Sequence, residues 1–224
     1  MIDPVEARAR ASRGASAPAI CRLVAESLAA RHFGGGTILD VGCGRGDLFP
    51  LVRERFETYV GADAVRYEDF PTGVEFVAVD LDTGRVPKPD GFADAVVAVE
   101  TIEHLENPRA FVRELTRLAK PGGWIAVTTP NQLSLLSKLT LVTRNEFNAF
   151  RAGSYPAHLT ALLEIDLRRI AAECDWREIA VAYTRRGRIP GTGRAWPRWI
   201  SALAPRTFSD NLLVVGRKPG APGA

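Results

Sequence analysis

Acidic residues and glycines share one short stretch of this chain, and their spacing indicates a binding loop. A brief apolar run leads to Asp40, then Gly42, Gly44 and Gly46 stand at alternate positions, and an amphipathic segment begins at Leu48. In parallel α/β sheets, a strand, a glycine-rich turn and a helix in this order present backbone groups to a nucleotide-like ligand. The stretch is therefore the first candidate for a binding site.

The spacing of the glycines distinguishes between two cofactors. Gly42 and Gly44 fit the first positions of the dinucleotide fingerprint G-x-G-x-x-G, but Asp47 stands at the third. The carboxylate of Asp40 would repel a pyrophosphate and attract an amine. The loop argues against NAD and favours S-adenosylmethionine, which carries an ammonium and a sulfonium group. A glycine turn without a ligand is the alternative.

A second candidate group for chemistry is the run E-T-I-E-H at 100–104, which follows an apolar stretch typical of a strand. Histidine can remove a proton near neutral pH, so His104 is the favoured general base, with Glu103 beside it. His158, at the end of a long irregular segment, is the next candidate. A structural junction between strand and helix is the alternative for the E-H pair.

The elements that must position these groups alternate along the chain. Apolar runs near Ile38, Tyr59, Phe76, Ala95 and Ile125 predict five strands separated by helices or loops. Such alternation predicts right-handed crossovers and a parallel sheet.

Helical spacing of apolar residues predicts further helices, and two more apolar runs predict strands. The expected helices are 19–30, 109–119 and 159–173, and the expected strands are 176–184 and 210–216. We therefore expect an α/β fold with a doubly wound, mostly parallel seven-stranded sheet and helices on both faces.

Two segments do not follow this pattern, 132–157 and 185–208, and the second is rich in Gly, Pro, Arg and Trp. Loops of this length in a compact domain are commonly functional or mobile. Both lie near the carboxyl ends of their preceding strands, where ligands bind in open sheets. We assign both to the substrate side. The alternative for the segment 185–208 is a basic loop that is only exposed to solvent.

Size and composition limit the class of protein. A chain of 224 residues fits one domain, which we divide into an N-terminal helical cap (1–35), a cofactor-binding half (36–131) and a substrate-side half (132–224). The net charge of +3 neither demands nor excludes a polyanionic partner. Three scattered cysteines, no signal-peptide pattern and no membrane-spanning run lead us to expect a cytoplasmic protein with reduced thiols.

The glycine-rich loop resembles motif I of the class I S-adenosylmethionine-dependent methyltransferases. Further matches follow in order, with Y-V-G-A-D at 59–63, F-V-A-V-D-L at 76–81 and a P-G-G turn at 121–123. Within this class, the chain resembles the ubiquinone-biosynthesis-like methyltransferases and those of polysaccharide and natural-product clusters. The resemblance implies a Rossmann-like sheet whose last strand is antiparallel and inserts between the fifth and sixth.

The resemblance also implies where the cofactor S-adenosylmethionine is bound. Asp40 would orient the amine of its methionine part, directly or through water, and Asp63 would accept both ribose hydroxyls. Asp80 would accept a hydrogen bond from the adenine amine. The implied cofactor-binding set is Asp40, Gly42, Cys43, Gly44, Asp63, Ala64, Asp80, Leu81 and Glu100.

The implied reaction is methyl transfer to a hydroxyl, or an amine, of a small molecule or a sugar-containing metabolite. E-x-x-E-H followed by a distant histidine also resembles the small-RNA 3′-terminal 2′-O-methyltransferases, in which a divalent metal holds the terminal hydroxyls. Glu100, Glu103, His104 and His158 would then be the ligands. No metal is favoured, because methyltransferases without one carry the same residues.

Nucleic acid is the less favoured partner, because no groove of aromatic and basic residues is evident outside the segment 185–208. A scaffold protein that has kept the fold but lost activity is disfavoured by the intact Asp40, Gly42, Gly44 and Asp63. The sequence leaves the oligomeric state open.

Overall fold

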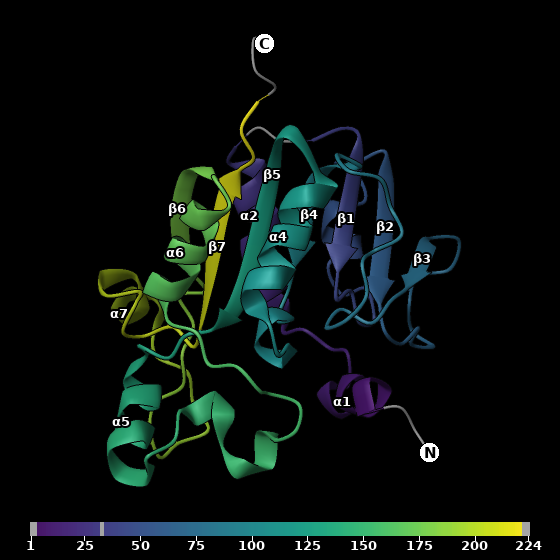
Figure 1. Cartoon of the computed structure of the whole chain (residues 1–224). Coiled ribbons are helices and arrows are strands. Elements are labelled where there is room, and N and C mark those ends of the chain that lie inside the picture. The colour runs from purple at the N-terminus through teal and green to yellow at the C-terminus, as the bar shows by residue number, and fades with distance from the viewer. Residues whose placement is uncertain (1–3, 32–33, 221–224) are drawn as a thin grey trace.

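A computed structural model describes residues 4–31 and 34–220, and Figure 1 shows them arranged around a central sheet. Across this described part of the chain the sheet has the order β3-β2-β1-β4-β5-β7-β6. β7 is antiparallel to both of its neighbours, and every other pair is parallel. The strands are β1 (Thr37–Val41), β2 (Thr58–Asp63), β3 (Glu75–Ala78), β4 (Ala93–Ala98), β5 (Ala119–Pro130), β6 (Arg177–Tyr183) and β7 (Asn211–Arg217).

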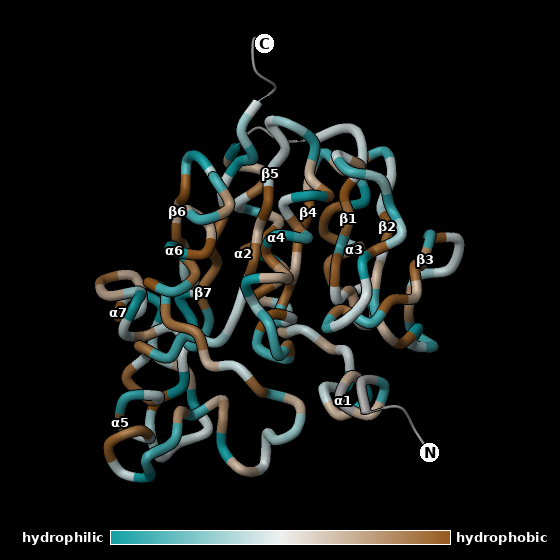
Figure 2. The backbone as a smooth tube through the Cα atoms, in the orientation of Figure 1, coloured by the Kyte–Doolittle hydropathy of each residue, from teal (hydrophilic) through white to brown (hydrophobic). Residues whose placement is uncertain are grey.

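This topology confirms the prediction of a doubly wound, mostly parallel sheet of seven strands with the last one antiparallel between the fifth and sixth. The central strands are continuous apolar runs because helices cover both faces, and Figure 2 shows them as the most hydrophobic part of the trace. One apolar cluster includes Phe111, Leu115 and Ile170, and the other includes Val24 and Leu48.

The helices divide between these faces and the edge beyond the sheet. α4 (Pro108–Leu118) and α6 (Glu164–Glu173) cover one face, and α2 (Pro18–Ala29) and the short α3 (Phe49–Val52) cover the other. Beyond the carboxyl ends of the parallel strands lie α1 and α5, as Figure 1 shows. The remaining elements are α1 (Pro4–Ser12), α5 (Leu135–Arg144), α7 (Arg198–Leu203) and the 3-10 turns η1 (Ile102–His104), η2 (Asn148–Phe150) and η3 (Ala152–Ser154).

Local sequence accounts for several of these boundaries. The side chain of Asn107 accepts a hydrogen bond from the N–H of Ala110 and caps α4, and Pro108 occupies the first turn. Ser134 caps α5 in the same way, and Asn145 ends it in the left-handed conformation. The predicted 19–30 and 109–119 helices and the 176–184 and 210–216 strands agree with the structure to within one residue at each end.

The predicted helix 159–173 is wrong at its start, because α6 begins only at Glu164. The N–H groups of Leu159 and Thr160 donate to the carbonyl of Glu103 at 2.9 and 3.0 Å. The hydroxyl of Thr160 donates to the carbonyl of Leu105 at 2.6 Å. These bonds attach the residues before α6 to η1, and the helix begins only after this attached segment.

None of the helices that the structure describes is long and apolar enough to cross a membrane. Cys21, Cys43 and Cys174 are free thiols, in agreement with the absence of a disulfide pattern.

Candidate functional site

A cavity of about 560 Å³ opens at the carboxyl ends of the parallel strands, where open α/β sheets bind their ligands. Small-molecule sites have volumes of about 300–1,000 Å³, so the cavity can hold a cofactor and part of a substrate. Its walls come from the N-terminal segment, the loops after β1, β2 and β4, and the segment after β5. The predicted cofactor residues that line it are Gly42, Gly44, Asp63, Ala64, Asp80, Leu81 and Glu100.

The glycine turn after β1 is held against β2 and the N-terminal segment. Gly42, at φ +78°, donates its N–H to the carbonyl of Ala62 at 2.7 Å. A Cβ on Gly42 would collide with the side chain of Thr101, and one on Gly44 would collide with the carbonyl oxygen of Gly14. Only glycine fits both places, and its missing side chains leave backbone at the cavity wall.

Asp63 ends β2 and faces the cavity with a carboxylate that the backbone holds in place. Its Oδ2 accepts from the N–H of Gly44 at 2.8 Å, and its Oδ1 accepts from the N–H of Val65 at 3.3 Å. Burial raises the pKa of this carboxyl, and the bonds from backbone N–H groups oppose that rise. A carboxylate has about four lone-pair sites, so two remain for a ligand such as a vicinal diol.

Asp40 and Cys43 lie behind the wall and are not among the lining residues. Tyr59 donates its hydroxyl to Oδ2 of Asp40 at 2.5 Å, and Oδ1 is buried with no hydrogen-bond partner in the described structure. Burial raises the pKa of Asp40 to about 7, against the lowering effect of the Tyr59 bond. Asp40 therefore supports the turn from behind, and its contact with a cofactor amine stays a prediction.

Asp80 and Leu81 line the cavity on the far side of Asp63. Oδ1 of Asp80 accepts from the N–H of Asp82 at 2.9 Å, and the hydroxyl of Thr83 donates to Oδ2. The carboxylate is thus already engaged in a local turn, and its role toward an adenine amine is untested. Asp82 also lines the cavity, although the sequence analysis did not name it.

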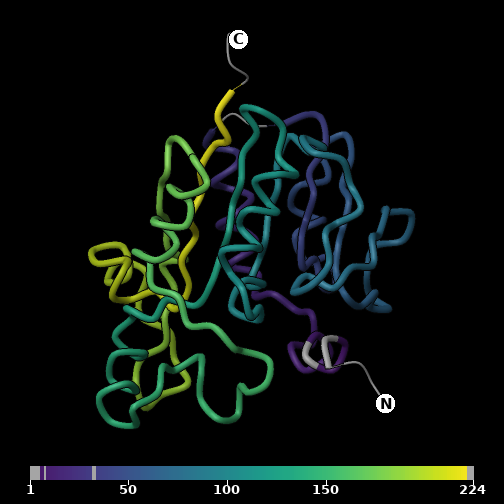
Figure 3. Tube along the Cα trace, in the orientation of Figure 1, coloured from purple at the N-terminus to yellow at the C-terminus, as the bar shows by residue number. Residues whose placement is uncertain are grey.

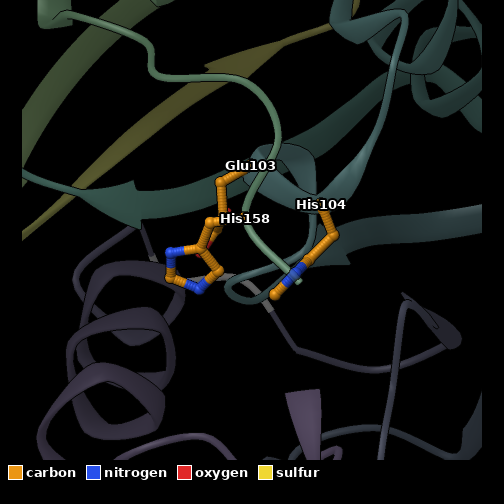
Figure 4. A group of neighbouring side chains, drawn as sticks. All are labelled: Glu103, His104 and His158. Carbon is orange, nitrogen blue, oxygen red and sulfur yellow. The ribbon is translucent and has the colours of Figure 1, made fainter. Parts of the chain in front are cut away.

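Glu103, His104 and His158 meet at another part of the cavity wall, as Figure 4 shows. Nδ1 of His104 lies 2.6 Å from the carbonyl oxygen of Ala157, and Nδ1 of His158 lies 2.6 Å from that of Ala149. The ring centroids are 4.8 Å apart. Since a carbonyl can only accept, each Nδ1 carries a proton, and in the neutral form of each ring the lone pair lies on Nε2.

Glu100 and Glu103 form a pair of interacting carboxyl groups on the cavity wall, and Glu103 is fully buried. Glu100 accepts from Asn211 Nδ2 at 2.8 Å and from the Thr128 hydroxyl at 3.3 Å. Glu103 accepts from the Thr129 hydroxyl at 3.3 Å, and its Oε1 has no hydrogen-bond partner among the residues described. Burial raises the pKa of Glu100 to about 7. Burial, and then repulsion from Glu100, raise the pKa of Glu103.

The predicted metal ligands come together only in part. One ligand atom each from Glu103, His104 and His158 lies within 4.8 Å of the other two, so these three side chains could hold a divalent ion. Glu100 lies outside this group, and its carboxylate binds Asn211 and Thr128 instead.

Residues of the N-terminal segment, which the sequence analysis described as a helical cap, form a further wall of the cavity. The trace in Figure 3 shows the chain leaving α1 and passing the carboxyl ends of the strands before it enters α2. The N–H of Arg45 donates to the carbonyl of Gly14 at 2.8 Å, and the hydroxyl of Tyr67 donates to that of Ala9 at 2.6 Å. No local motif could have indicated contacts across such separations in sequence.

The opposite wall of the cavity is polar, and most of it comes from the segment 132–157, which the sequence analysis assigned to the substrate side. Its hydrogen-bonding side chains include Asn131, Gln132, Ser134, Ser137, Asn148 and Ser154.

Comparison with known proteins identifies relatives of this arrangement. A family model described as "Methyltransferase domain" matches residues 13–178. A protein of Mycolicibacterium smegmatis named "Probable S-adenosylmethionine-dependent methyltransferase" is 31% identical over 142 residues, which are 60% of this chain and 52% of that protein. A "Ubiquinone biosynthesis O-methyltransferase" of Leptothrix cholodnii is 30% identical over 108 residues, 44% of this chain and 46% of its own length. The chain spans about half the length of these curated relatives.

Solved structures share the fold at lower identity. The 1,6-didemethyltoxoflavin-N1-methyltransferase of Burkholderia thailandensis, with bound 1,6-didemethyltoxoflavin and S-adenosylhomocysteine, aligns with a TM-score of 0.60 and 15% identity over 90% of this chain and 79% of that one. A SAM-dependent methyltransferase of Archaeoglobus fulgidus aligns with a TM-score of 0.60 and 20% identity over 88% and 94%. These likenesses agree with the observed strand order.

Proposed function

The chain belongs to the class I S-adenosylmethionine-dependent methyltransferases, and we propose that it transfers a methyl group from this cofactor to a hydroxyl group of a polar small molecule or sugar-containing metabolite. The observation that carries the proposal is one cavity with two kinds of wall. The glycine turn and Asp63 lie at one wall, and two imidazoles with Nε2 lone pairs lie at another.

The cofactor wall fits S-adenosylmethionine in shape and in charge. Gly42 and Gly44 have no Cβ, so their backbone remains accessible at the cavity wall. Asp63 keeps lone pairs for a ribose diol. When bound, S-adenosylmethionine supplies an electrophilic methyl group on a positively charged sulfur. Glu100, at the end of β4, offers a carboxyl of raised pKa on the same cavity, which a nearby cation would hold ionised.

On the acceptor side, His104 is proposed as the general base. When the acceptor oxygen displaces the methyl group from sulfur, Nε2 of His104 would take up the hydroxyl proton, while the Nδ1 bond to Ala157 holds the ring. Burial lowers the pKa of His158, so this second imidazole is neutral at neutral pH and can orient the acceptor hydroxyl. A carboxylate oxygen of Glu103 lies within 4.8 Å of a ring nitrogen of each histidine.

The polar side chains on the acceptor wall favour a hydroxylated acceptor over an apolar one. The relatives named as O-methyltransferases support oxygen as the acceptor atom. Identification of the methylated product distinguishes an amine acceptor from a hydroxyl acceptor.

A labelling experiment tests the proposal. Purified protein is incubated with methyl-labelled S-adenosylmethionine and a panel of free sugars, amino sugars and sugar phosphates, and transfer of label to a hydroxyl is expected. In calorimetry, Asp63→Ala should weaken S-adenosylhomocysteine binding at least about tenfold, because a diol contact is lost. Glu57→Ala removes an exposed acid away from the cavity and serves as the control. Unchanged affinity of Asp63→Ala would refute the assigned pocket.

A second candidate function is metal-dependent 2′-O-methylation of the 3′ end of small RNA. The specific observation in its favour is the three-ligand group of Glu103, His104 and His158. Under this alternative, EDTA abolishes activity, Glu103→Gln fails to bind Mn²⁺, and an RNA with a free 3′ end is labelled while a blocked one is not. Full turnover in chelator removes this candidate.

A further inference from the structure

A second cavity, of about 280 Å³, adjoins the main one. It lies between the start of α2 and the segment that follows β6. The two cavities are lined in part by the same residues, so a ligand can extend from one into the other. The shared residues are Ala17, Ile20, Arg188, Asp210 and Asn211.

This second cavity carries an excess of positive charge. The segment 185–208 contains six arginines and no acidic residue. Arg186 and Arg188 line the second cavity, and Arg151 lines the main one. Asp210 is the acidic residue on this wall, and its Oδ2 accepts from Nε of Arg188 at 2.8 Å. No ion pair of Arg151 or Arg186 occurs in the part of the chain that the structure describes.

The arginines stand on a hydrogen-bonded loop that holds their backbone in place. Arg188 forms a bridge with Ala195, and the N–H of Trp196 donates to the carbonyl of Gly187 at 2.8 Å. The N–H of Asp210 donates to the carbonyl of Arg186 at 3.0 Å, which ties the loop to the start of β7. The backbone of the loop is therefore held beside the main cavity, and Asp210 also holds the guanidinium of Arg188.

We propose that the second cavity binds a phosphate group of the acceptor, so that the methyl acceptor is a small phosphate ester such as a sugar phosphate or a nucleoside diphosphate sugar. The planar guanidinium of arginine binds phosphate with two parallel hydrogen bonds, and two arginines against one aspartate leave the second cavity with a net positive charge. The inference rests on the proposed function: the sugar hydroxyl lies at the histidines, and the phosphate lies at Arg186 and Arg188.

Calorimetry on the complex with S-adenosylhomocysteine tests the site, with inorganic pyrophosphate and uridine diphosphate as probes. We expect one molecule of each probe to bind per chain. Arg186→Gln and Arg188→Gln should each weaken binding about tenfold or more, because each loses a charged phosphate contact. Arg186→Gln breaks no ion pair of the described structure, so it separates phosphate binding from folding. Arg113→Gln, on α4 away from both cavities, is the matched control and should bind as the wild type does.

The outcomes separate the two proposals. If S-adenosylhomocysteine binds but neither probe does, or if Arg186→Gln binds pyrophosphate as tightly as the wild type, the phosphate site is refuted and the proposed function stands. If S-adenosylhomocysteine itself does not bind, the proposed function fails. Tighter binding of uridine diphosphate than of pyrophosphate supports a nucleotide-linked acceptor, and the reverse supports a sugar phosphate. A single-stranded oligoribonucleotide that binds where uridine diphosphate does not would overturn the small-molecule assignment.

Discussion

At the scale of single residues, the site is dominated by carboxyl groups whose pKa values burial raises. Asp40, Asp63, Glu100 and Glu103 all belong to this group, and each lies on or just behind the cavity wall. Burying a charge is unfavourable unless an opposite charge lies near it. These carboxyl groups therefore favour the binding of a cation in the cavity, in agreement with a cofactor that carries an ammonium and a sulfonium group.

The buried Asp40 yields a prediction about stability and pH. Its pKa is about 7 in the folded chain against an ordinary 3.8, so the unfolded chain releases this proton first as the pH rises. The wild type should therefore lose stability between these two values, by on the order of 4 kcal/mol. Asp40→Asn, which keeps an acceptor for Tyr59, removes that loss.

The measurement is urea unfolding of both proteins without cofactor at several pH values. The free energy of unfolding of Asp40→Asn minus that of the wild type should increase as the pH rises from about 4 to about 8. Other titrating groups, including Asp63 and Asp47, are common to both proteins, so their largest effects cancel in the difference. A difference that does not change with pH would contradict the buried, unpaired state of Asp40.

His104 yields a prediction about catalysis. Glutamine at this position can still donate to the carbonyl of Ala157, but it cannot take up the acceptor proton. With the acceptor found by labelling, His104→Gln should lower kcat by about a hundredfold or more, which is the usual range for a lost general base. Its affinity for S-adenosylhomocysteine should match that of the wild type. A kcat within a few-fold of the wild type would refute the role of His104 as a base.

At the scale of elements, the turn between β1 and α3 connects three parts of the chain. Its backbone binds Asp63 at the end of β2 and packs at Gly42 against Thr101, just before η1. At Gly44 and Arg45 it contacts the N-terminal segment. The binding loop is thus also the point at which the wall before α2 is attached.

Gly44→Ala tests this attachment. Alanine at position 44 would have to keep the left-handed backbone at φ +50°, and its Cβ would displace the carbonyl group of Gly14. We expect a loss of about 1–3 kcal/mol in stability from the strained backbone alone. Because the N-terminal wall must also move, S-adenosylhomocysteine binding should weaken about tenfold.

Gly73→Ala is the matched control for this variant. Gly73 has φ +79°, but a Cβ there would meet nothing within 4 Å. It should lose stability from backbone strain while its affinity for S-adenosylhomocysteine stays unchanged. Equal affinities of the two variants would show that the Gly14 contact does not shape the site.

At the scale of the whole molecule, helices cover both faces of the sheet, and two walls of the cavity extend beyond the carboxyl ends of its parallel strands. Figure 1 shows α1 on one side of these strand ends and α5 with the neighbouring turns on the other. The first wall borders the cofactor residues, and the second borders the histidines and the arginine-rich loop. We predict that the division into cap, cofactor half and substrate half corresponds to these walls and the sheet between them.

Limited trypsin digestion tests this arrangement. A bound cofactor should hold the N-terminal wall against the glycine turn, so S-adenosylhomocysteine should slow cleavage after Arg10 and Arg13. Cleavage after the exposed Arg194 and Arg198 lies outside that wall and should keep its rate, which gives an internal control. Mass spectrometry of the fragments over time measures both. Equal protection at both sites would indicate a general stabilisation instead of closure of the N-terminal wall.

Sequence by itself determined the parts of this protein that depend on neighbours along the chain. Alternating apolar runs predicted the strands, capping residues and prolines predicted α2 and α4 to within one residue, and the glycine spacing predicted the turn after β1. Each of these depends on backbone conformation and hydrophobic periodicity, which local residues control. The antiparallel last strand came from the family resemblance, because periodicity does not encode strand order.

Only the tertiary structure decided which groups face one another. In the folded chain α6 begins at Glu164, and Asp40 lies behind the cavity wall. His104 lies beside His158, which comes from another segment. It also laid the residues before α2 across the glycine turn and set Arg188 beside Asp210. These outcomes depend on packing and on hydrogen bonds between residues far apart in sequence, and the energy of such contacts is defined only once the chain has folded.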